Sequence, residues 1–292
     1  MKQSMSPLVH NAGFEQIGWD GVYVPMPVEG SYESFKATVL SLIDHQELNF
    51  EGASVTIPHK EHLVQCYPEL DHHPSQTRML GSANTLCFEI DHSDELNLHE
   101  VFNPHPENTD SFAIHELMKN ELGSVQGSKV MIFGAGGVAR GVLAAVAHSG
   151  CAVFIVNRDM QRAESLVEEL TNGATPYSMN SIYPITLNEI SKHLCDLYIN
   201  CTPVGMTGGP DPDGLSIPIP DMPNLSPDTV FFDTVYNPIE TPMLKAAKER
   251  GYRTIDGVQM FVKQAAAQFE IWTGQAAPEA LFDTLVRTKL SE

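Results

Sequence analysis

A glycine cluster between two apolar segments has the spacing that points most directly to chemistry. Gly134, Gly136 and Ala139 fit the pattern G-x-G-x-x-G/A. In this pattern the glycines let the backbone approach a pyrophosphate group, which binds the N–H groups at the start of the next helix. An ordinary strand-to-helix turn can contain the same glycines, so the pattern alone is weak. The cluster predicts a dinucleotide site, with a ligand-free turn as the alternative.

The residues after the next apolar segment indicate which dinucleotide would bind. Asn157-Arg158 follows that segment, and Arg162 lies one helical turn further on. An acidic residue here usually binds the ribose 2′-hydroxyl of NAD, whereas arginine suits a 2′-phosphate. Asp159 favours NAD, but a screened repulsion costs only about 1 kcal/mol at about 4 Å, less than the roughly 1.5–3 kcal/mol of a charge-assisted hydrogen bond. We therefore expect NADP to bind. The alternatives are that NAD binds, or that the two arginines are solvated surface residues.

Several polar residues in expected loops have the chemistry to transfer a proton or bind a substrate. Lys60 follows Pro58 at the end of an expected strand, and Asp110 precedes a helical pattern. An ammonium held by a carboxylate can give a proton to a ketone, but a solvated lysine and a helix N-cap are the ordinary roles. Ser4 and Ser6 could cap a helix that begins at Pro7 or bind a ligand carboxylate. Composition alone leaves these alternatives open.

The elements that would position these residues form two α/β regions. In the first region we expect strands at 21–28, 53–57 and 83–90, helices at 32–43, 61–66 and 110–122, and a polar loop at 91–106. From Val130 to about Asp256, strands at 130–133, 152–156, 197–200 and 230–233 alternate with helices, as in a doubly wound parallel sheet. Helices at 258–274 and 278–290 follow.

Composition limits the classes of function. With 292 residues and 42% hydrophobic content, the chain can form two domains with a substantial core. A net charge of -20 disfavours nucleic acid and anionic membranes. No apolar run has membrane-spanning length, and the first twenty residues lack the basic and apolar regions expected of a signal peptide. Five scattered cysteines and the lack of an H-E-x-x-H pattern predict no metal site. We expect a cytoplasmic protein that acts on a small molecule.

A series of short motifs runs along nearly the whole chain. They are Ser4-Met-Ser6-Pro7, Ser54-Val-Thr56-Ile-Pro58-His-Lys60-Glu61, Asn84-Thr85, Asn108-Thr109-Asp110, Gly134-Ala-Gly-Gly137, Asn157-Arg158, Asn200-Cys-Thr202-Pro203, Asp233-Thr-Val-Tyr236-Asn-Pro238 and Gly257-Val-Gln-Met260. Each motif is weak alone, but their joint occurrence in this order is specific. Through these motifs the chain resembles the shikimate dehydrogenase family.

The resemblance implies reversible, NADP-dependent reduction of 3-dehydroshikimate to shikimate, on the pathway to chorismate and the aromatic amino acids. It implies that Lys60 and Asp110 are the catalytic pair, and burial would have to lower the pKa of Lys60 for it to act as a base. The implied substrate contacts are Ser4, Ser6, Thr56, Asn84, Tyr236 and Gln264. The implied cofactor contacts are Gly134, Ala135, Gly136, Gly137, Val138, Asn157, Arg158, Arg162, Thr234, Gly257 and Met260. For Met260, core packing is an equal alternative.

The resemblance also implies a domain plan. Residues 1–109 would form an α/β substrate-binding catalytic domain, completed by the helices of 258–292, and residues 110–257 a Rossmann-like NADP domain, with the substrate in the cleft between them. A monomer or homodimer is expected. The alternatives are an NAD-dependent quinate/shikimate dehydrogenase of the same fold and a non-catalytic nucleotide-binding protein.

Four departures from the family pattern qualify these expectations, and three of them are Ser54 in place of Asn, Ser111 in place of Gly and Asp159 in place of Thr. Family members have a strand and a G-x-P-I-x-H segment before the first serine, whereas this sequence opens at Met1-Lys2-Gln3-Ser4. If this is the true start, an edge strand beneath the substrate site is missing and activity would be weakened. Ser54, and glutamines at both 264 and 268, resemble the plant-type enzymes fused to dehydroquinate dehydratase.

Overall fold

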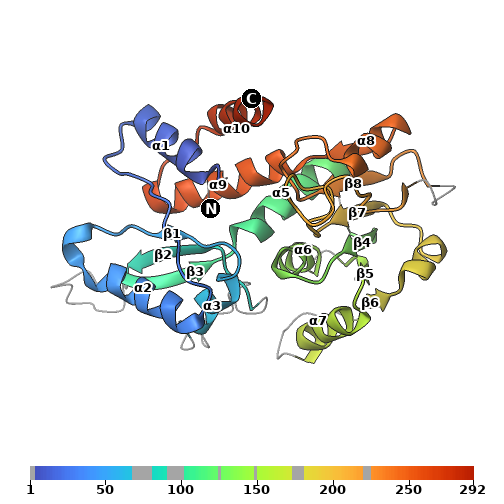
Figure 1. Cartoon of the computed structure of the whole chain (residues 1–292), viewed down its shortest axis with the longest axis horizontal. Helices are drawn as coiled ribbons and strands as arrows, with labels where there is room; N and C mark the ends of the chain where they lie inside the picture. The colour runs from blue at the N-terminus through green and yellow to red at the C-terminus, as the bar shows by residue number, and fades with distance from the viewer. Residues whose placement is uncertain are drawn as a thin grey trace. The chain divides into compact units, whose positions relative to one another are not determined.

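Contacts between residues divide the chain into two units. A computed structural model describes residues 4–67, 81–90, 102–123, 126–147, 150–172, 181–219 and 225–292. The first unit consists of Met1–Thr109 with Ala265–Pro278, and the second of Asp110–Gln264 with Glu279–Glu292. Helices α5 (Thr109–Leu122) and α9 (Gly257–Thr273), both labelled in Figure 1, each contain a boundary. Helix α10 (Glu279–Ser291) is assigned to the second unit by its contacts. The stretch 258–292, expected to complete the first domain, is thus divided between the two units by its contacts.

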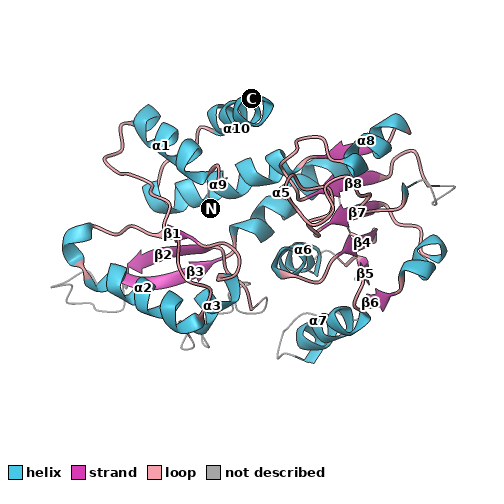
Figure 2. Ribbon diagram, viewed as in Figure 1, coloured by secondary structure: helices cyan, strands magenta, loops and turns pink. Residues whose placement is uncertain are grey.

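The first unit contains an antiparallel sheet in the order β1-β2-β3. The strands are β1 (Ala53–Ser54), β2 (Thr85–Ile90) and β3 (Phe102–Glu107), and the helices are α1 (Ser6–Ile17), α2 (Tyr32–Asp44), η1 (Gln46–Leu48) and α3 (Lys60–Gln65) (Figure 2). Phe35 of α2 and Leu63 of α3 pack in one core cluster with Leu86 of β2. Amphipathic helices therefore cover the sheet, as the apolar spacing at 32–43 predicts.

Two expectations for this unit are wrong. The segment 21–28 is not a strand, and it exposes Val22 and Val24 (75% and 59%). Its prolines at 25 and 27 cannot donate ladder hydrogen bonds. The expected loop at 91–106 instead contains β3 from Phe102 onward, while 91–101 lie outside the described residues. Pro104 and Pro106 suggested a loop, but β3 is an edge strand, where proline is tolerated.

The second unit contains a parallel sheet in the order β6-β5-β4-β7-β8-β9. Its strands are β4 (Lys129–Phe133), β5 (Ala152–Val156), β6 (Ile182–Ile185), β7 (Leu197–Asn200), β8 (Val230–Asp233) and β9 (Arg253–Ile255). This confirms the predicted doubly wound fold. The strand order reverses between β4 and β7, and open α/β sheets bind ligands beyond the carboxyl ends of the strands at such a point.

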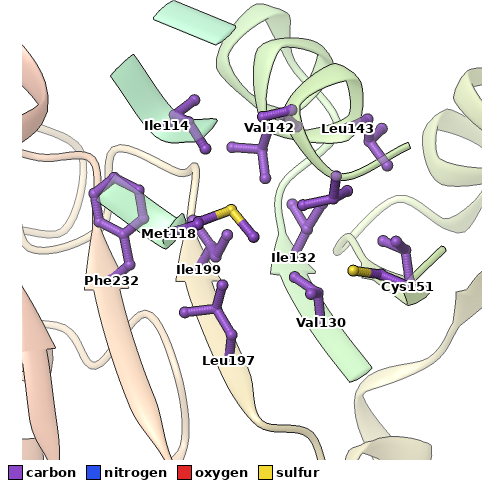
Figure 3. Close-up of a cluster of buried hydrophobic side chains, with 14 of the residues drawn as sticks. Ile114, Met118, Val130, Ile132, Val142, Leu143, Cys151, Leu197, Ile199 and Phe232 are labelled. Carbon is purple, nitrogen blue, oxygen red and sulfur yellow. The ribbon is translucent and has the colours of Figure 1, made fainter. Parts of the chain in front are cut away.

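Helices cover both faces of this sheet, which explains why its strands are continuous apolar runs. Val130 and Ile132 pack in a cluster with α5 and α6, while Met131 and Phe133 pack in a second cluster with α8. Figure 3 shows the first cluster, where side chains from α5 and α6 meet the strands. Between α5 and α9, the described part of this unit contains the helices α6 (Gly137–Ala147), α7 (Met160–Asn172), η3 (Leu187–Lys192) and α8 (Pro242–Glu249). In the described residues, no helix is long and apolar enough to span a membrane.

Candidate functional site

The turn between β4 and α6 has the shape of a phosphate cradle. A Cβ at Gly134 would lie 2.9 Å from the carbonyl oxygen of Cys201, and φ is +112° there, so only glycine is accommodated without strain. At the exposed Gly136, an added Cβ would meet no described atom within 4 Å. The turn therefore leaves open backbone in front of the helix that begins at Gly137, where N–H groups favour an anion. A pyrophosphate fits these residues. The candidates Ala135 and Val138 are their neighbours in the sequence.

The residues after β5 leave the two arginines available to an anion. The Asn157 side chain donates a hydrogen bond to the Asp159 carbonyl (2.8 Å), and the Asp159 carboxylate accepts one from the Gln161 N–H (3.1 Å). Asp159 thus stabilises the start of α7, and in the described part of the chain it pairs with neither Arg158 nor Arg162, both of which are exposed. The alternative of two solvated surface arginines assumed that Asp159 pairs with one of them, and the Asp159 side chain does not do so in the described residues.

The ends of β7 and β8 meet in a buried hydrogen-bonded network. Asn200 and Asp233 are register partners, and the Asn200 amide donates to the Asp233 carboxylate at 2.9 Å. The same carboxylate accepts from the Thr241 hydroxyl (2.7 Å) and the Val235 N–H (3.0 Å). Burial raises the pKa of Asp233 to about 6 despite these donors.

The candidate residues of the following loop are anchored to this network. Thr234 donates its N–H (3.1 Å) and its hydroxyl (2.8 Å) to the Asn200 carbonyl. The Tyr236 ring lies 5.4 Å from the Phe261 ring, and burial raises the pKa of Tyr236. A Cβ at Gly257 would lie 2.2 Å from the carbonyl oxygen of Val235, so the start of α9 needs glycine against this loop.

Two further candidates lie on α9. Met260 is only 6% exposed and packs in the core cluster, as the alternative of core packing predicts. Its contact with a cofactor stays a prediction. The Gln264 side chain donates to the Phe261 carbonyl (3.1 Å).

In the first unit, a short turn positions the candidate lysine. The His59 N–H donates to the Thr56 carbonyl (2.8 Å) just after β1, and α3 begins at Lys60. The Ala83 N–H donates to the Lys60 carbonyl (2.9 Å), which holds this turn beside the start of β2. Lys60 is half-buried and Thr56 is exposed, and their contact with a ligand stays a prediction.

Asn84 fixes the residue that precedes the candidate carboxylate. Its side chain donates to the Thr109 hydroxyl (3.0 Å) and accepts from the Thr109 N–H (2.8 Å). Asp110 then lies in the first turn of α5, 6% exposed, and does not precede the helix as an N-cap. By the contact division Lys60 belongs to the first unit and Asp110 to the second.

The two N-terminal serines differ in their surroundings. Helix α1 begins at Ser6, and its N-cap residue is Met5, so neither serine is its N-cap. The Ser4 hydroxyl accepts the Ser6 N–H at 3.3 Å. Burial raises the pKa of the Tyr23 hydroxyl, and the nearby Ser54 and Ser6 side chains partly offset this rise. Ser6 therefore lies near Tyr23, in the segment 21–28 that the sequence pattern had assigned to a strand.

Sequence reasoning assigned no role to Gln268, which is 1% exposed. Its side chain accepts from the Ser54 hydroxyl (2.8 Å) and donates to the Thr85 hydroxyl (2.9 Å) and the Asn84 carbonyl (3.2 Å). The available signal was its position four residues after Gln264, which puts both on one face of a helix. Asn200 and Asp233 were quoted in motifs without a role, because polar residues at strand ends are common. Among the described residues, no group of three or more acidic, histidine or cysteine side chains could hold a metal ion.

Comparisons with known proteins agree with this arrangement. Family models match residues 1–86 (shikimate dehydrogenase substrate binding domain), 116–200 (shikimate / quinate 5-dehydrogenase) and 257–287 (shikimate 5'-dehydrogenase C-terminal domain). A shikimate dehydrogenase (NADP(+)) of Gluconobacter oxydans is 35% identical over 292 residues, covering 98% of this chain and 92% of the relative.

Solved structures extend the comparison to the fold. A shikimate dehydrogenase in complex with NADP+ has a TM-score of 0.81 at 29% identity, over 100% of this chain and 93% of that chain. A quinate dehydrogenase from Corynebacterium glutamicum in complex with NAD has a TM-score of 0.77 at 27% identity, over 98% and 95%. The similarity therefore extends from the first motif to the last helix, and the chain belongs to the shikimate dehydrogenase family.

Proposed function

We propose that this protein catalyses the reversible, NADP-dependent reduction of 3-dehydroshikimate to shikimate. The observation that carries the proposal is the match of three shikimate dehydrogenase family models, in order, to a chain whose parallel sheet has a dinucleotide turn at its switch point. The relative from Gluconobacter oxydans, named for this activity, is matched over nearly its whole length.

In this proposal Lys60 transfers the proton and Asp110 assists it. The Lys60 ammonium donates a proton to the ketone oxygen as hydride reaches the carbonyl carbon, so that C=O becomes CH–OH and the lysine becomes a neutral amine. Bound NADPH supplies the hydride. The Asp110 carboxylate stabilises the ammonium form, and in the reverse reaction the neutral amine accepts the hydroxyl proton of shikimate. A positioned proton donor of this kind contributes roughly 10²–10⁴ in rate.

The remaining candidates would bind and orient the two ligands. Hydroxyl and carboxamide groups suit the hydroxyls and carboxylate of the substrate, and we assign this role to Ser4, Ser6, Thr56, Asn84, Tyr236 and Gln264. The N–H groups from Gly134 to Val138 would hold the pyrophosphate, with Thr234, Gly257 and Met260 beside the nicotinamide half.

We assign the 2′-phosphate to Arg158 and Arg162, with Asn157 beside it. The carboxylate of Asp159 supports this assignment, because it accepts the Gln161 N–H and does not pair with either arginine in the described residues. An NAD-dependent quinate/shikimate dehydrogenase is the second candidate, since a solved quinate dehydrogenase in complex with NAD has a similar fold. Quinate differs from shikimate by one water molecule added across the ring double bond, so kinetics with both alcohols separates the candidates.

The test is oxidation of shikimate by the purified chain, followed at 340 nm with NADP+ and with NAD+, and with quinate as the second alcohol. Turnover of shikimate with NADP+ alone is the expected result. A preference for NAD+ or quinate would favour the second candidate. A folded chain that binds NADPH but turns over no pair would instead support a non-catalytic nucleotide-binding protein.

The catalytic assignment is tested by Lys60→Ala. We expect turnover to fall by about 10³ or more while the Kd for NADPH is unchanged, because the proton donor is lost and the phosphate cradle is not. Lys36→Ala is the matched control, since Lys36 lies over the Tyr32 ring on α2 and has no role in the proposal. Loss of NADPH binding in Lys60→Ala would mean that the lysine has been assigned the wrong role.

We further propose that the protein works in the cytoplasm as a monomer or homodimer. Gel filtration with light scattering of the purified chain gives the mass in solution, and a larger assembly would contradict this proposal.

A further inference from the structure

The loop of residues 234–241, between β8 and α8, carries two proposed ligand contacts, Thr234 and Tyr236. Asp233 stands immediately before this loop and is 0% exposed. Its carboxylate accepts from the Val235 N–H (3.0 Å) at the start of the loop and from the Thr241 hydroxyl (2.7 Å) at its end. One side chain therefore joins the two ends of the loop.

The loop after β7 is fastened to the same point. The Asn200 amide donates to the Asp233 carboxylate, while its amide oxygen accepts the Thr202 N–H (2.9 Å) and hydroxyl (2.7 Å). Further along, the Thr207 N–H donates to the Asn237 carbonyl (2.8 Å). The two loops thus form one hydrogen-bonded assembly, and its residue Thr202 lies against Gly134 of the phosphate cradle.

Burying the Asp233 carboxylate in this space is energetically unfavourable. Removing an ionised carboxylate from water is unfavourable, and an apolar side chain of similar volume often suits a fold better. An apolar residue here would leave the Asn200 amide, the Val235 N–H and the Thr241 hydroxyl without their acceptor. A fully satisfied polar network specifies one conformation, which is what a loop that must orient ligands requires.

We propose that Asp233 is a positioning residue that sets Thr234 and Tyr236 for the cofactor and the substrate. The inference rests on the proposed function for the identity of those two ligands. Asp233 acts through the loop backbone, through Asn200 and through Thr241, and contacts neither ligand itself.

The test is Asp233→Asn, measured at pH 8. The carboxamide keeps the shape and one acceptor oxygen for Asn200 and Val235, but its NH₂ group can no longer accept from Thr241. We expect KM for shikimate to rise about tenfold and the Kd for NADP+ about threefold, with kcat within about threefold of wild type. Hydrogen exchange at Thr234, Val235 and Tyr236 should be faster, and the unfolding midpoint should not fall below that of wild type.

Two further variants separate positioning from general stability. Thr229→Val removes a buried hydroxyl that has no partner in the described residues, at the opposite end of β8, and should leave KM, Kd and exchange at wild-type values. Thr241→Ser keeps the hydroxyl that Asp233 accepts and should also retain wild-type KM. Failure of Thr241→Ser to do so would contradict the hydrogen bond as the cause.

Wild-type KM, Kd and exchange in folded Asp233→Asn would overturn the proposal. A lower unfolding midpoint with fewer active molecules of unchanged KM would overturn it too, since that is the result of a merely structural role. If the wild-type chain does not oxidise shikimate, the proposed function fails. Exchange at 234–236 and NADP+ affinity then still decide whether Asp233 positions the loop.

Discussion

The two loops at the carboxyl end of the second unit's sheet are shaped by opposite means. The turn at 134–136 is defined by missing side chains, because Gly134 lies against Cys201 with no space for a Cβ. The loop at 234–241 is defined by polar side chains, because Asp233 accepts hydrogen bonds from both of its ends. The first should be damaged by adding an atom and the second by removing one. Four measurements of the free energy of unfolding test this contrast, from the largest expected effect to the smallest.

Gly134→Ala should be the most damaging change. The new Cβ would lie 2.9 Å from the backbone oxygen of Cys201, and residue 134 itself has a φ of +112°. Backbone strain and overpacking each cost about 1–3 kcal/mol, so we expect about 4 kcal/mol of lost stability together with loss of NADP+ binding. Urea unfolding measures the first and a fluorescence titration the second. A fully stable variant would show that the turn relaxes easily, contrary to the steric argument.

Thr241→Val should be the next most damaging. Valine has the same shape but leaves one oxygen of Asp233 without its donor, and it removes the side-chain cap that accepts the Leu244 N–H at 3.3 Å. We expect a loss of about 2 kcal/mol in urea unfolding, with Thr241→Ser within about 0.5 kcal/mol of wild type. Equal losses in both variants would indicate that the methyl group, not the hydroxyl, matters.

The Asp233 carboxylate should make stability depend on pH. Its pKa in the folded chain is raised to about 6 from its ordinary value of 3.8, chiefly by burial. The protonated form therefore stabilises the fold below about pH 4, and this contribution is lost as pH rises through about 6. We expect the stability of wild type relative to Asp233→Asn to fall by about 1 kcal/mol between about pH 5.5 and 8.

Urea unfolding of both proteins at several pH values measures this difference, because the other titrating groups cancel in the comparison. A difference that does not change with pH would show that the carboxyl has an ordinary pKa in the fold.

Gly136→Ala should be the mildest change, and it sharpens the contrast within the turn itself. The new Cβ meets no described atom within 4 Å, so stability should change by less than about 0.5 kcal/mol. The methyl would instead occupy the open backbone where a phosphate approaches, and the Kd for NADP+ should rise about tenfold. A destabilised Gly136→Ala that binds NADP+ normally would reverse the roles assigned to the two glycines.

The same contrast explains what the sequence could predict. The Gly134 turn follows from a local pattern, and so do β7, β8 and the helices at 32–43 and 110–122, because each is specified by neighbouring residues. The strand expected at 21–28 was wrong, since an alternating apolar pattern says nothing about whether a pairing partner exists. Likewise, β3 was missed because its prolines are acceptable only at a sheet edge, which is a tertiary property.

Polar networks are harder still to predict. Asn200 and Asp233 are 33 residues apart, and Ser54 and Gln268 are 214 apart, so no local pattern links either pair. The candidate residues named from family motifs remain predictions for the same reason, because their roles depend on ligands that meet groups distant in the chain.

The first unit has a consequence for synthesis on the ribosome, because it is built from both early and late parts of the chain. Gln268 accepts a hydrogen bond from Ser54 and donates one to Thr85, and Trp272 donates one to the Leu86 carbonyl. These three partners all emerge much earlier. Domains often fold in order as they emerge, but this unit has to wait until the whole parallel sheet of the other unit has been made. A nascent chain that stops before Ala265 would expose the β1-β2 edge unfinished, and it would be a target for chaperones and proteases even though its nucleotide turn was complete.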